Sequence, residues 1–363
     1  MIERLERSID RIAAQRHASV SRLYWYTDLD KAQEAAKGRG RPILSLRLLG
    51  RLDEELSCAN SRFFRVALYA NERLSHYLQN HFVLHWSSER PAPKITIDYG
   101  DGRTLIRTIT GNSIHYVLSP DAHPIDALPG LYGPWAFQRH LQEIEFAGVL
   151  SLGPDAERVA NNSRAAHERL ISNLEAQWAS EYGAVGGNPQ LIRTGVNAPS
   201  STATPGAYDA MSGAVTKSFV ETPLLRAVLP SPGSVAVDSL PWAELAKYHR
   251  EEARLDARSR SLMRSKNPFD WSVNGEPKPM SDETFAKVVE GFENLMAIES
   301  ARNEFLFHAT LHRWFVDASS TRELRGLNQR VYAELFKTPA SDPWLGLVPT
   351  DSFSALDNDG LHK

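Results

Sequence analysis

The sequence predicts an α/β domain followed by a mostly helical region, and three observations support this prediction. Between residues 21 and 150, apolar runs of strand length alternate with longer amphipathic segments, which is typical of a sheet flanked by helices. Beyond about residue 150 the strand-like runs stop. The length of 363 residues also exceeds the usual size of one compact domain, which favours two structural units or one domain with a large appendage.

The chain begins with a helix and an aromatic strand. Charged and apolar residues recur at helical spacing over residues 1–17, and we assign residues 1–20 to an N-terminal helix. Residues 21–27 are aromatic and strand-like. Asp28 is a typical N-cap, and the helix that it begins ends at the glycine and arginine run that starts at Gly38.

The rest of the α/β domain, which we place at residues 21–150, continues with further strands and helices. The apolar run 43–49 predicts a buried strand, and the apolar stripe of residues 58–79 predicts a helix lying on the sheet. Residues 94–109 alternate around a Gly-Asp-Gly turn and predict a hairpin. The remaining elements are strands at 81–86, 114–118 and 125–128 and a helix with Pro134 in its first turn.

The region 151–363 is predicted to be mostly helical. It contains a segment, residues 186–214, that is rich in Gly, Pro, Ser, Thr and Asn without any period, and we predict that this segment is flexible. The predicted helical stretches are 155–182, 241–266, a long helix that begins at Ser281 and continues to Phe315, and a last helix over 321–336.

Composition excludes several classes of function. The formal net charge of -3 gives no general attraction to phosphate, so we do not expect nucleic-acid binding. No apolar run approaches the roughly 20 residues of a membrane-spanning helix, and the N-terminus is charged where a secretory signal is apolar, so we expect a cytoplasmic protein. The single cysteine, Cys58, excludes an intrachain disulfide and a multi-cysteine zinc site.

Five sequence segments carry a family likeness. In order they are RPILSLRLL, Cys58-Ala-Asn-Ser61 before an amphipathic helix, HFVLHW, GNSIHYVLSPD and LPGLYGPWAFQRHL. Their order and spacing resemble the thioredoxin-like superfamily over roughly the first two-fifths of the chain. In that family a strand delivers a Cys-x-x-Cys motif to a helix N-terminus, and a later loop places a cis-proline beside it. The resemblance implies a reactive thiol at Cys58 and a partner-binding groove around residues 112–114.

The chain departs from the family pattern at two positions. Ser61 stands where the second cysteine would be, and such a monothiol site can form a mixed disulfide but cannot resolve it internally. Ser113 stands where the cis-proline would be, and we expect a trans bond there because a cis bond costs several kcal/mol without proline.

The chemistry of Cys58 stays open at the level of sequence. A helix N-terminus favours the thiolate, whereas the acidic residues at 53–55 disfavour it. Cys58 is therefore either a buried structural thiol, a thiol that forms mixed disulfides or senses oxidation, or a single-thiolate metal ligand. His115 lies on the same sheet end in the expected fold, where it either activates the thiol or is an ordinary strand histidine.

The long C-terminal helix carries a second set of polar residues. Glu304, His308 and His312 follow at four-residue steps and so share one helix face. The first and third are two turns apart, about 12 Å by helix rise, so a metal ion would need two neighbours and a further residue from elsewhere. The other interpretation is an amphipathic edge with satisfied polar groups, and we assign no metal site and no cofactor.

Two functional hypotheses from different classes follow, with a third behind them. The first is a monothiol thiol–disulfide oxidoreductase in which Cys58 and Ser61 are catalytic and a protein or a glutathione-like thiol is the partner. Its partner-binding residues are Asn112, Ser113, Ile114 and His115. The second is a non-catalytic interaction module with the thioredoxin fold. The third is a metal-binding helical protein.

Overall fold

The computed structural model describes residues 1–108, 111–146, 156–188, 241–270, 277–317 and 323–345. Most of the segment 186–214 that the sequence predicts to be flexible lies outside these ranges, as does the tail 346–363.

A four-stranded mixed sheet forms the centre of the α/β part, in the order β2-β1-β5-β6. Strand β1 runs parallel to β2 and antiparallel to β5, and β6 is antiparallel to β5. The strands are β1 (Ile43–Leu49), β2 (Val83–Arg90), β5 (Ser113–Leu118) and β6 (Pro124–Pro129). The predicted α/β class, with a helical region after it, is confirmed at this level.

The helices that connect the strands follow the predicted order with one break. The helix expected over residues 58–79 is interrupted near Tyr69, because the side chain of Asn71 accepts a hydrogen bond from the Leu74 N–H and caps a new helix. The connection consists of α4 (Ala59–Phe63), a π-helical turn (Phe64–Leu68) and α5 (Glu72–His81), and α6 (Pro134–Phe146) follows the sheet.

The N-terminal elements correct two predictions. The helix assigned to residues 1–20 ends at Ala13, where Ala14 adopts a left-handed conformation, and a separate short helix covers Ala18–Ser21. Residues 21–27 do not form a strand, since only Tyr26 pairs with the sheet, through a single bridge to His85. Asp28 caps its helix as predicted, accepting hydrogen bonds from the N–H groups of the first turn. The helices are α1 (Ile2–Ala13), α2 (Ala18–Ser21) and α3 (Leu29–Arg39).

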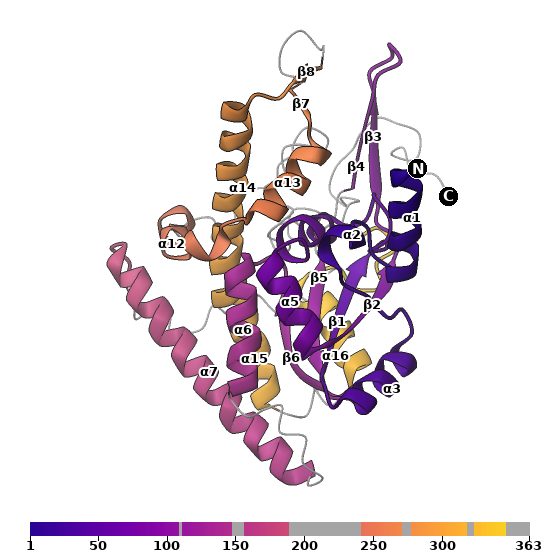
Figure 1. Cartoon of the computed structure of the whole chain (residues 1–363). Coiled ribbons are helices and arrows are strands. Elements are labelled where there is room, and N and C mark those ends of the chain that lie inside the picture. The colour runs from indigo at the N-terminus through magenta and orange to yellow at the C-terminus, as the bar shows by residue number, and fades with distance from the viewer. Residues whose placement is uncertain (109–110, 147–155, 189–240, 271–276, 318–322, 346–363) are drawn as a thin grey trace, which may run out of the picture.

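The predicted hairpin is confirmed as a separate two-stranded ribbon, β3 (Lys94–Asp98) and β4 (Thr104–Thr108). It extends away from the central sheet (Figure 1).

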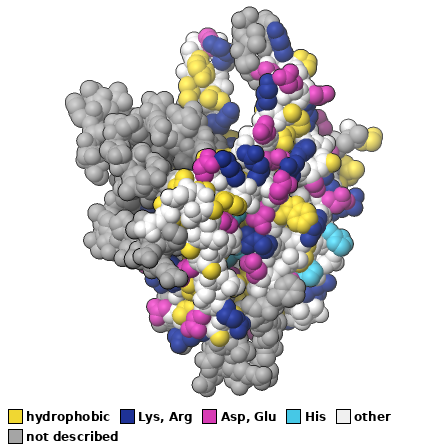
Figure 2. All heavy atoms as spheres, turned by 90° about the vertical axis from the view of Figure 1, so that its left-hand side faces the viewer, with side chains coloured by type: hydrophobic (Ala, Val, Ile, Leu, Met, Phe, Trp, Pro, Cys, Tyr) yellow, Lys and Arg dark blue, Asp and Glu magenta, His cyan; other side chains and the backbone are white. Residues whose placement is uncertain are grey.

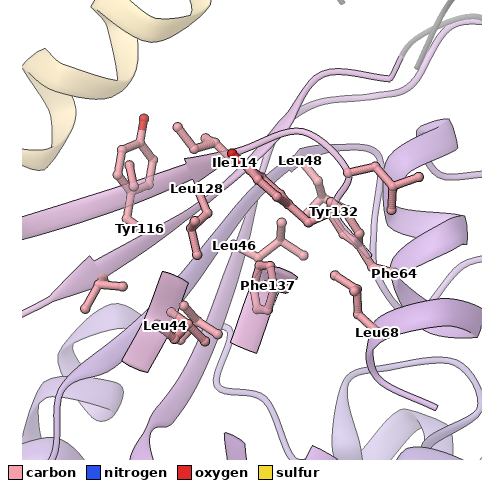
Figure 3. Close-up of a cluster of buried hydrophobic side chains, with 14 of the residues drawn as sticks. Leu44, Leu46, Leu48, Phe64, Leu68, Ile114, Tyr116, Leu128, Tyr132 and Phe137 are labelled. Atoms are coloured by element: carbon pink, nitrogen blue, oxygen red, sulfur yellow. The ribbon is translucent and has the colours of Figure 1, made fainter. Parts of the chain in front are cut away.

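The core lies on both faces of the central sheet because its strands are apolar on both sides. On one face, side chains such as Leu46, Phe64 and Phe137 gather between the strands and helices (Figure 3). On the other face, the Tyr116 hydroxyl donates a hydrogen bond to Asn328 of α16 (Leu324–Arg330). The sheet is therefore covered in part by the C-terminal helices.

The helical region packs against the α/β part in a common hydrophobic cluster. The longest element of this region is one continuous helix over residues 282–316. Ser281 caps its start, as predicted, and a π-helical segment lies inside it. The elements are α7 (Ala156–Ala184), α12 (Trp242–His249), a 3-10 turn (Glu251–Ala253), α13 (Ala257–Lys266), the short strands β7 (Phe269–Asp270) and β8 (Lys278–Pro279), α14 (Asp282–Arg302), a π-helical segment (Asn303–His308), α15 (Ala309–Val316), α16 and a π-helical turn (Val331–Leu335).

Among the residues that the structure describes, no helix combines the length and the apolar character needed to cross a bilayer. Acidic and basic side chains are interspersed over the face drawn in Figure 2.

Candidate functional site

Cys58 lies at the N-terminus of α4, as the sequence predicts. Cys58 is the N-cap residue of this helix. Its backbone N–H donates a hydrogen bond to the Leu49 carbonyl at the end of β1 (3.0 Å). The loop of residues 50–57 therefore returns to the end of the buried strand and places the thiol at a helix start.

The Cys58 sulfur is surrounded by hydroxyl groups and is closed to solvent. Its Sγ lies 3.4 Å from Ser61 Oγ and 3.8 Å from Ser113 Oγ. All three residues are 0% exposed. The structure thus brings the two serines to Cys58, and the peptide bond that precedes Ser113 is trans, as expected.

The loop beside Cys58 is covered by the chain itself. We call residues 324–338 the C-terminal segment. Asn112 Nδ2 donates a hydrogen bond to Thr338 Oγ1 at 2.6 Å, and the Tyr332 hydroxyl lies 3.4 Å from the Asn112 carbonyl oxygen. These groups are buried. The backbone that the resemblance assigns to a partner is therefore engaged by the C-terminal segment.

The other two predicted groove residues, Ile114 and His115, are enclosed in the core. His115 Nε2 is hydrogen-bonded to the Tyr69 hydroxyl at 2.7 Å, and its ring packs against Phe64 and Phe137. Burial lowers the pKa of His115 to about 3, so the ring is neutral at ordinary pH. Its hydrogen bond goes to Tyr69 rather than to the thiol.

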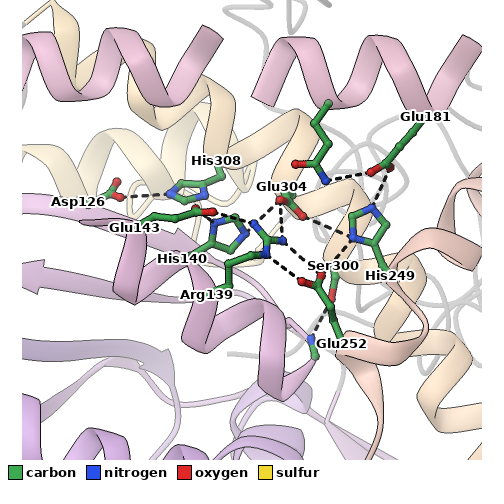
Figure 4. Close-up of polar contacts among 12 residues, drawn as sticks. Asp126, Arg139, His140, Glu143, Glu181, His249, Glu252, Ser300, Glu304 and His308 are labelled. Atoms are coloured by element: carbon green, nitrogen blue, oxygen red, sulfur yellow. Dashed lines mark hydrogen bonds and ion pairs between the residues drawn. The ribbon is translucent and has the colours of Figure 1, made fainter. Parts of the chain in front are cut away.

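A buried ionic cluster, which the sequence did not reveal as a unit, lies between the α/β part and the helical region (Figure 4). Its centre is the fully buried carboxylate of Glu304. Arg139 Nη2 lies 2.9 Å from Glu304, and the ring nitrogens of His140 and His249 lie 3.4 and 3.6 Å away. The ionic cluster also contains the carboxylates Glu143, Glu181 and Glu252.

The opposite charges in the ionic cluster stabilise one another's charged forms. Burial alone lowers the pKa of His140, but the Glu304 charge and the hydrogen bonds to Glu143 and Glu304 together outweigh it, and the pKa rises to about 9. The pKa of His249 is likewise lowered by burial and raised more strongly by carboxylates, first Glu181, again to about 9. Burial raises the pKa of Glu304, yet the surrounding cations hold it below its ordinary value. Both imidazoles are therefore cationic at neutral pH.

A second buried group, which we call the histidine cluster, consists of Asp126, His167, His308 and His312. It joins β6, α7, the π-helical segment and α15. His167 Nδ1 and His312 Nδ1 are 2.9 Å apart, His312 Nδ1 is 3.5 Å from Asp126 Oδ1, and His308 Nε2 is 3.3 Å from Asp126 Oδ2. All four residues are at most 1% exposed.

The structure divides the three polar residues of the long helix between the two clusters. Glu304 belongs to the ionic cluster, whereas His308 and His312 face Asp126. The sequence signal was their position within an apolar stripe, but their partners come from distant elements. Asp126 and His167, in strand β6 and helix α7, gave no signal of their own.

An open hollow of about 560 Å³ lies at the surface beside the ionic cluster. It is lined by Arg73, Trp135, Gln138, Arg139, Gln142, Glu251, Glu252 and Arg254. The guanidinium of Arg73 stacks on the Trp135 ring at 3.7 Å.

Comparison with protein-family models, curated proteins and solved structures gave no match for this chain.

Proposed function

We propose that this protein is a non-catalytic, thioredoxin-like interaction module in which the groove beside Cys58 holds the C-terminal segment of the same chain. The observation that carries the proposal is the enclosure of Cys58 together with the engagement of Asn112 by Tyr332 and Thr338. A thiol catalyst needs an accessible sulfur, and Cys58 has no exposed surface, which favours a non-catalytic role.

The thioredoxin-like assignment is supported by the connection of the elements. A strand leads to Cys58 at a helix start, a parallel strand follows, and the loop before the next, antiparallel strand returns to the sulfur. This is the arrangement that the resemblance implies. Ser61 and Ser113 replace the two residues on which dithiol chemistry in that family depends.

The test is mixed-disulfide formation with oxidised glutathione, followed by mass spectrometry of the intact full-length chain. We expect no adduct on the native protein and one adduct on the chain unfolded in denaturant. A stoichiometric adduct on the native chain within minutes would overturn the interaction-module proposal.

Monothiol exchange is the second candidate function. It is favoured by the position of the sulfur at a helix start within reach of Ser61 and Ser113. In this reaction the Cys58 thiolate attacks the glutathione sulfur of a protein–glutathione mixed disulfide, a Cys58–glutathione S–S bond forms, and the protein sulfur leaves as a thiolate. A glutathione thiolate then attacks the glutathione sulfur bonded to Cys58, which forms glutathione disulfide and frees the Cys58 thiolate.

The cover over Cys58 can be tested by replacing Thr338 with valine. Thr338→Val removes the acceptor of the Asn112 amide and leaves a buried donor unsatisfied, which costs about 1–3 kcal/mol. If the free energy of local opening of the C-terminal segment falls by this amount, labelling of Cys58 by a thiol reagent accelerates about 5–150-fold. The measurement is the labelling rate under native conditions.

The matched control is Ser45→Ala, which removes a buried hydrogen bond between Ser45 Oγ and His85 Nδ1 in the same sheet. We expect Ser45→Ala to accelerate the labelling of Cys58 by no more than its loss of global unfolding free energy accounts for. Equal acceleration by both variants at equal global stability would show that the C-terminal segment is not the cover.

A further inference from the structure

We propose that the histidine cluster is a structural binding site for one first-row divalent cation, with Zn²⁺ as the preferred ion, held by Asp126, His167 and His312. This site is separate from the Cys58 groove, so its test is independent of the glutathione experiment.

The distances in the cluster suit a shared ion. Two ligand atoms that lie 2.0–2.2 Å from one ion at 90–110° are about 2.8–3.6 Å apart. His167 Nδ1 and His312 Nδ1 are separated by 2.9 Å, and His312 Nδ1 and Asp126 Oδ1 by 3.5 Å. One ligand atom from each of the three residues lies within 4.8 Å of the other two. Two of the three ligand-atom separations therefore suit one shared ion.

Hydrogen bonds around the histidine cluster orient the proposed ligand atoms toward one another. His167 Nε2 lies 3.0 Å from the Ile125 carbonyl oxygen and donates its proton there, which leaves the Nδ1 lone pair facing the cluster. His308 Nε2 contacts the second carboxylate oxygen of Asp126, at 3.3 Å. Ligating histidines and carboxylates in metal sites are commonly oriented by such outer partners.

The charge balance distinguishes this cluster from its neighbour. Glu304 has the permanent cation Arg139 at 2.9 Å, whereas no Lys or Arg of the described residues lies within ion-pair distance of Asp126. The buried carboxylate of Asp126 therefore has only histidine side chains as ion-pair partners among the described residues, and a divalent cation would supply a permanent counter-charge.

The donor set indicates both the ion and its role. Two imidazole nitrogens and a carboxylate oxygen suit Zn²⁺ and its first-row neighbours better than Ca²⁺ or Mg²⁺, which prefer oxygen ligands. The ligands come from β6, α7 and α15 and are at most 1% exposed. The ion would therefore tie two helices to the edge strand of the sheet.

The experiment uses tag-free, full-length protein treated with a chelator and then titrated with Zn²⁺, or with Co²⁺ as a spectroscopic probe. We expect one equivalent to bind, Co²⁺ to give visible absorption bands, and Zn²⁺ to raise the melting temperature. Asp126→Asn and His312→Gln should each weaken binding by at least about 100-fold. His308→Gln, which changes only the outer partner, should weaken it about 10–100-fold.

The matched control is His249→Gln, a buried histidine of the ionic cluster that should lose stability but keep the metal. His308→Gln also serves if the ligand variants do not fold. A folded wild-type chain that binds neither ion and shows no change in melting temperature would overturn the proposal. Unchanged binding in Asp126→Asn and His312→Gln would do the same, and would assign the cluster to an ion-free hydrogen bond between His312 and His167.

Discussion

At the scale of single residues, the buried histidines show that neighbouring carboxylates can reverse the effect of burial on the pKa of the same side-chain type. His115 and His312 have lowered pKa values because burial is not offset, whereas His140 and His249 have raised ones because carboxylates surround them. The same imidazole group is thus neutral in one place and a cation at neutral pH in another.

The raised pKa of His249 predicts a pH dependence of stability. Its pKa is about 9 in the folded chain and about 6.5 when unfolded, so its contribution is complete below pH 6.5 and is lost as the pH rises through 9. We expect His249 alone to lower the free energy of unfolding, measured with urea, by on the order of 2–3 kcal/mol between pH 6.5 and 9.5, and His140, with its similarly raised pKa, to add a fall of the same sign. In His249→Gln this fall should be smaller.

The control for this prediction is the exposed histidine His76, whose replacement by glutamine should leave the pH profile unchanged. A wild-type stability that is level or rises over the same pH range would contradict the assignment of cationic imidazoles to the ionic cluster.

At the scale of elements, the contact between the start of α6 and the 3-10 turn fixes the helical region on the α/β part. A Cβ placed on Gly133 would lie 2.5 Å from the Glu252 carbonyl oxygen and 2.6 Å from the Ala253 Cα, so the two backbones touch there. We expect Gly133→Ala to lower the free energy of unfolding by about 1–3 kcal/mol, because neither backbone can move away easily. Thermal or urea unfolding measures the change.

Gly38→Ala is the matched control, because Gly38 lies exposed in α3 and nothing is within 4 Å of a Cβ placed there. Alanine is the better helix former, so this variant should be unchanged or up to about 1 kcal/mol more stable. Equal stability of the two alanine variants would mean that the two backbones are not in close contact.

Local signals account for what could be predicted about the elements. Asp28 and Ser281 mark helix starts, and the apolar run at residues 43–49 marks a buried strand. The break near Tyr69 was missed because the apolar stripe continues through it, although Asn71 before Glu72 is itself a cap signal. Residues 21–27 have strand composition but lack a neighbour along most of their length.

The site could be predicted only where its members are close in sequence or fixed by the resemblance. Cys58, Ser61 and Ser113 come together as expected. The engagement of Asn112 by Thr338 depends on residues 226 positions apart, which no local pattern reveals.

At the scale of the whole molecule, the sheet and the C-terminal helices share one hydrophobic core, and both buried clusters lie where they meet. The Cys58 groove is closed by the same packing. We therefore expect the thiol to become accessible only when the C-terminal segment opens away from the sheet.

The most direct measurement is the rate at which Cys58 reacts with a thiol reagent in the native full-length chain, relative to the same chain unfolded in denaturant. A closed groove predicts a native rate at least about 1,000-fold slower, which corresponds to an opening free energy of about 4 kcal/mol or more. A native rate within tenfold of the unfolded rate would show an accessible thiol and contradict the closed groove.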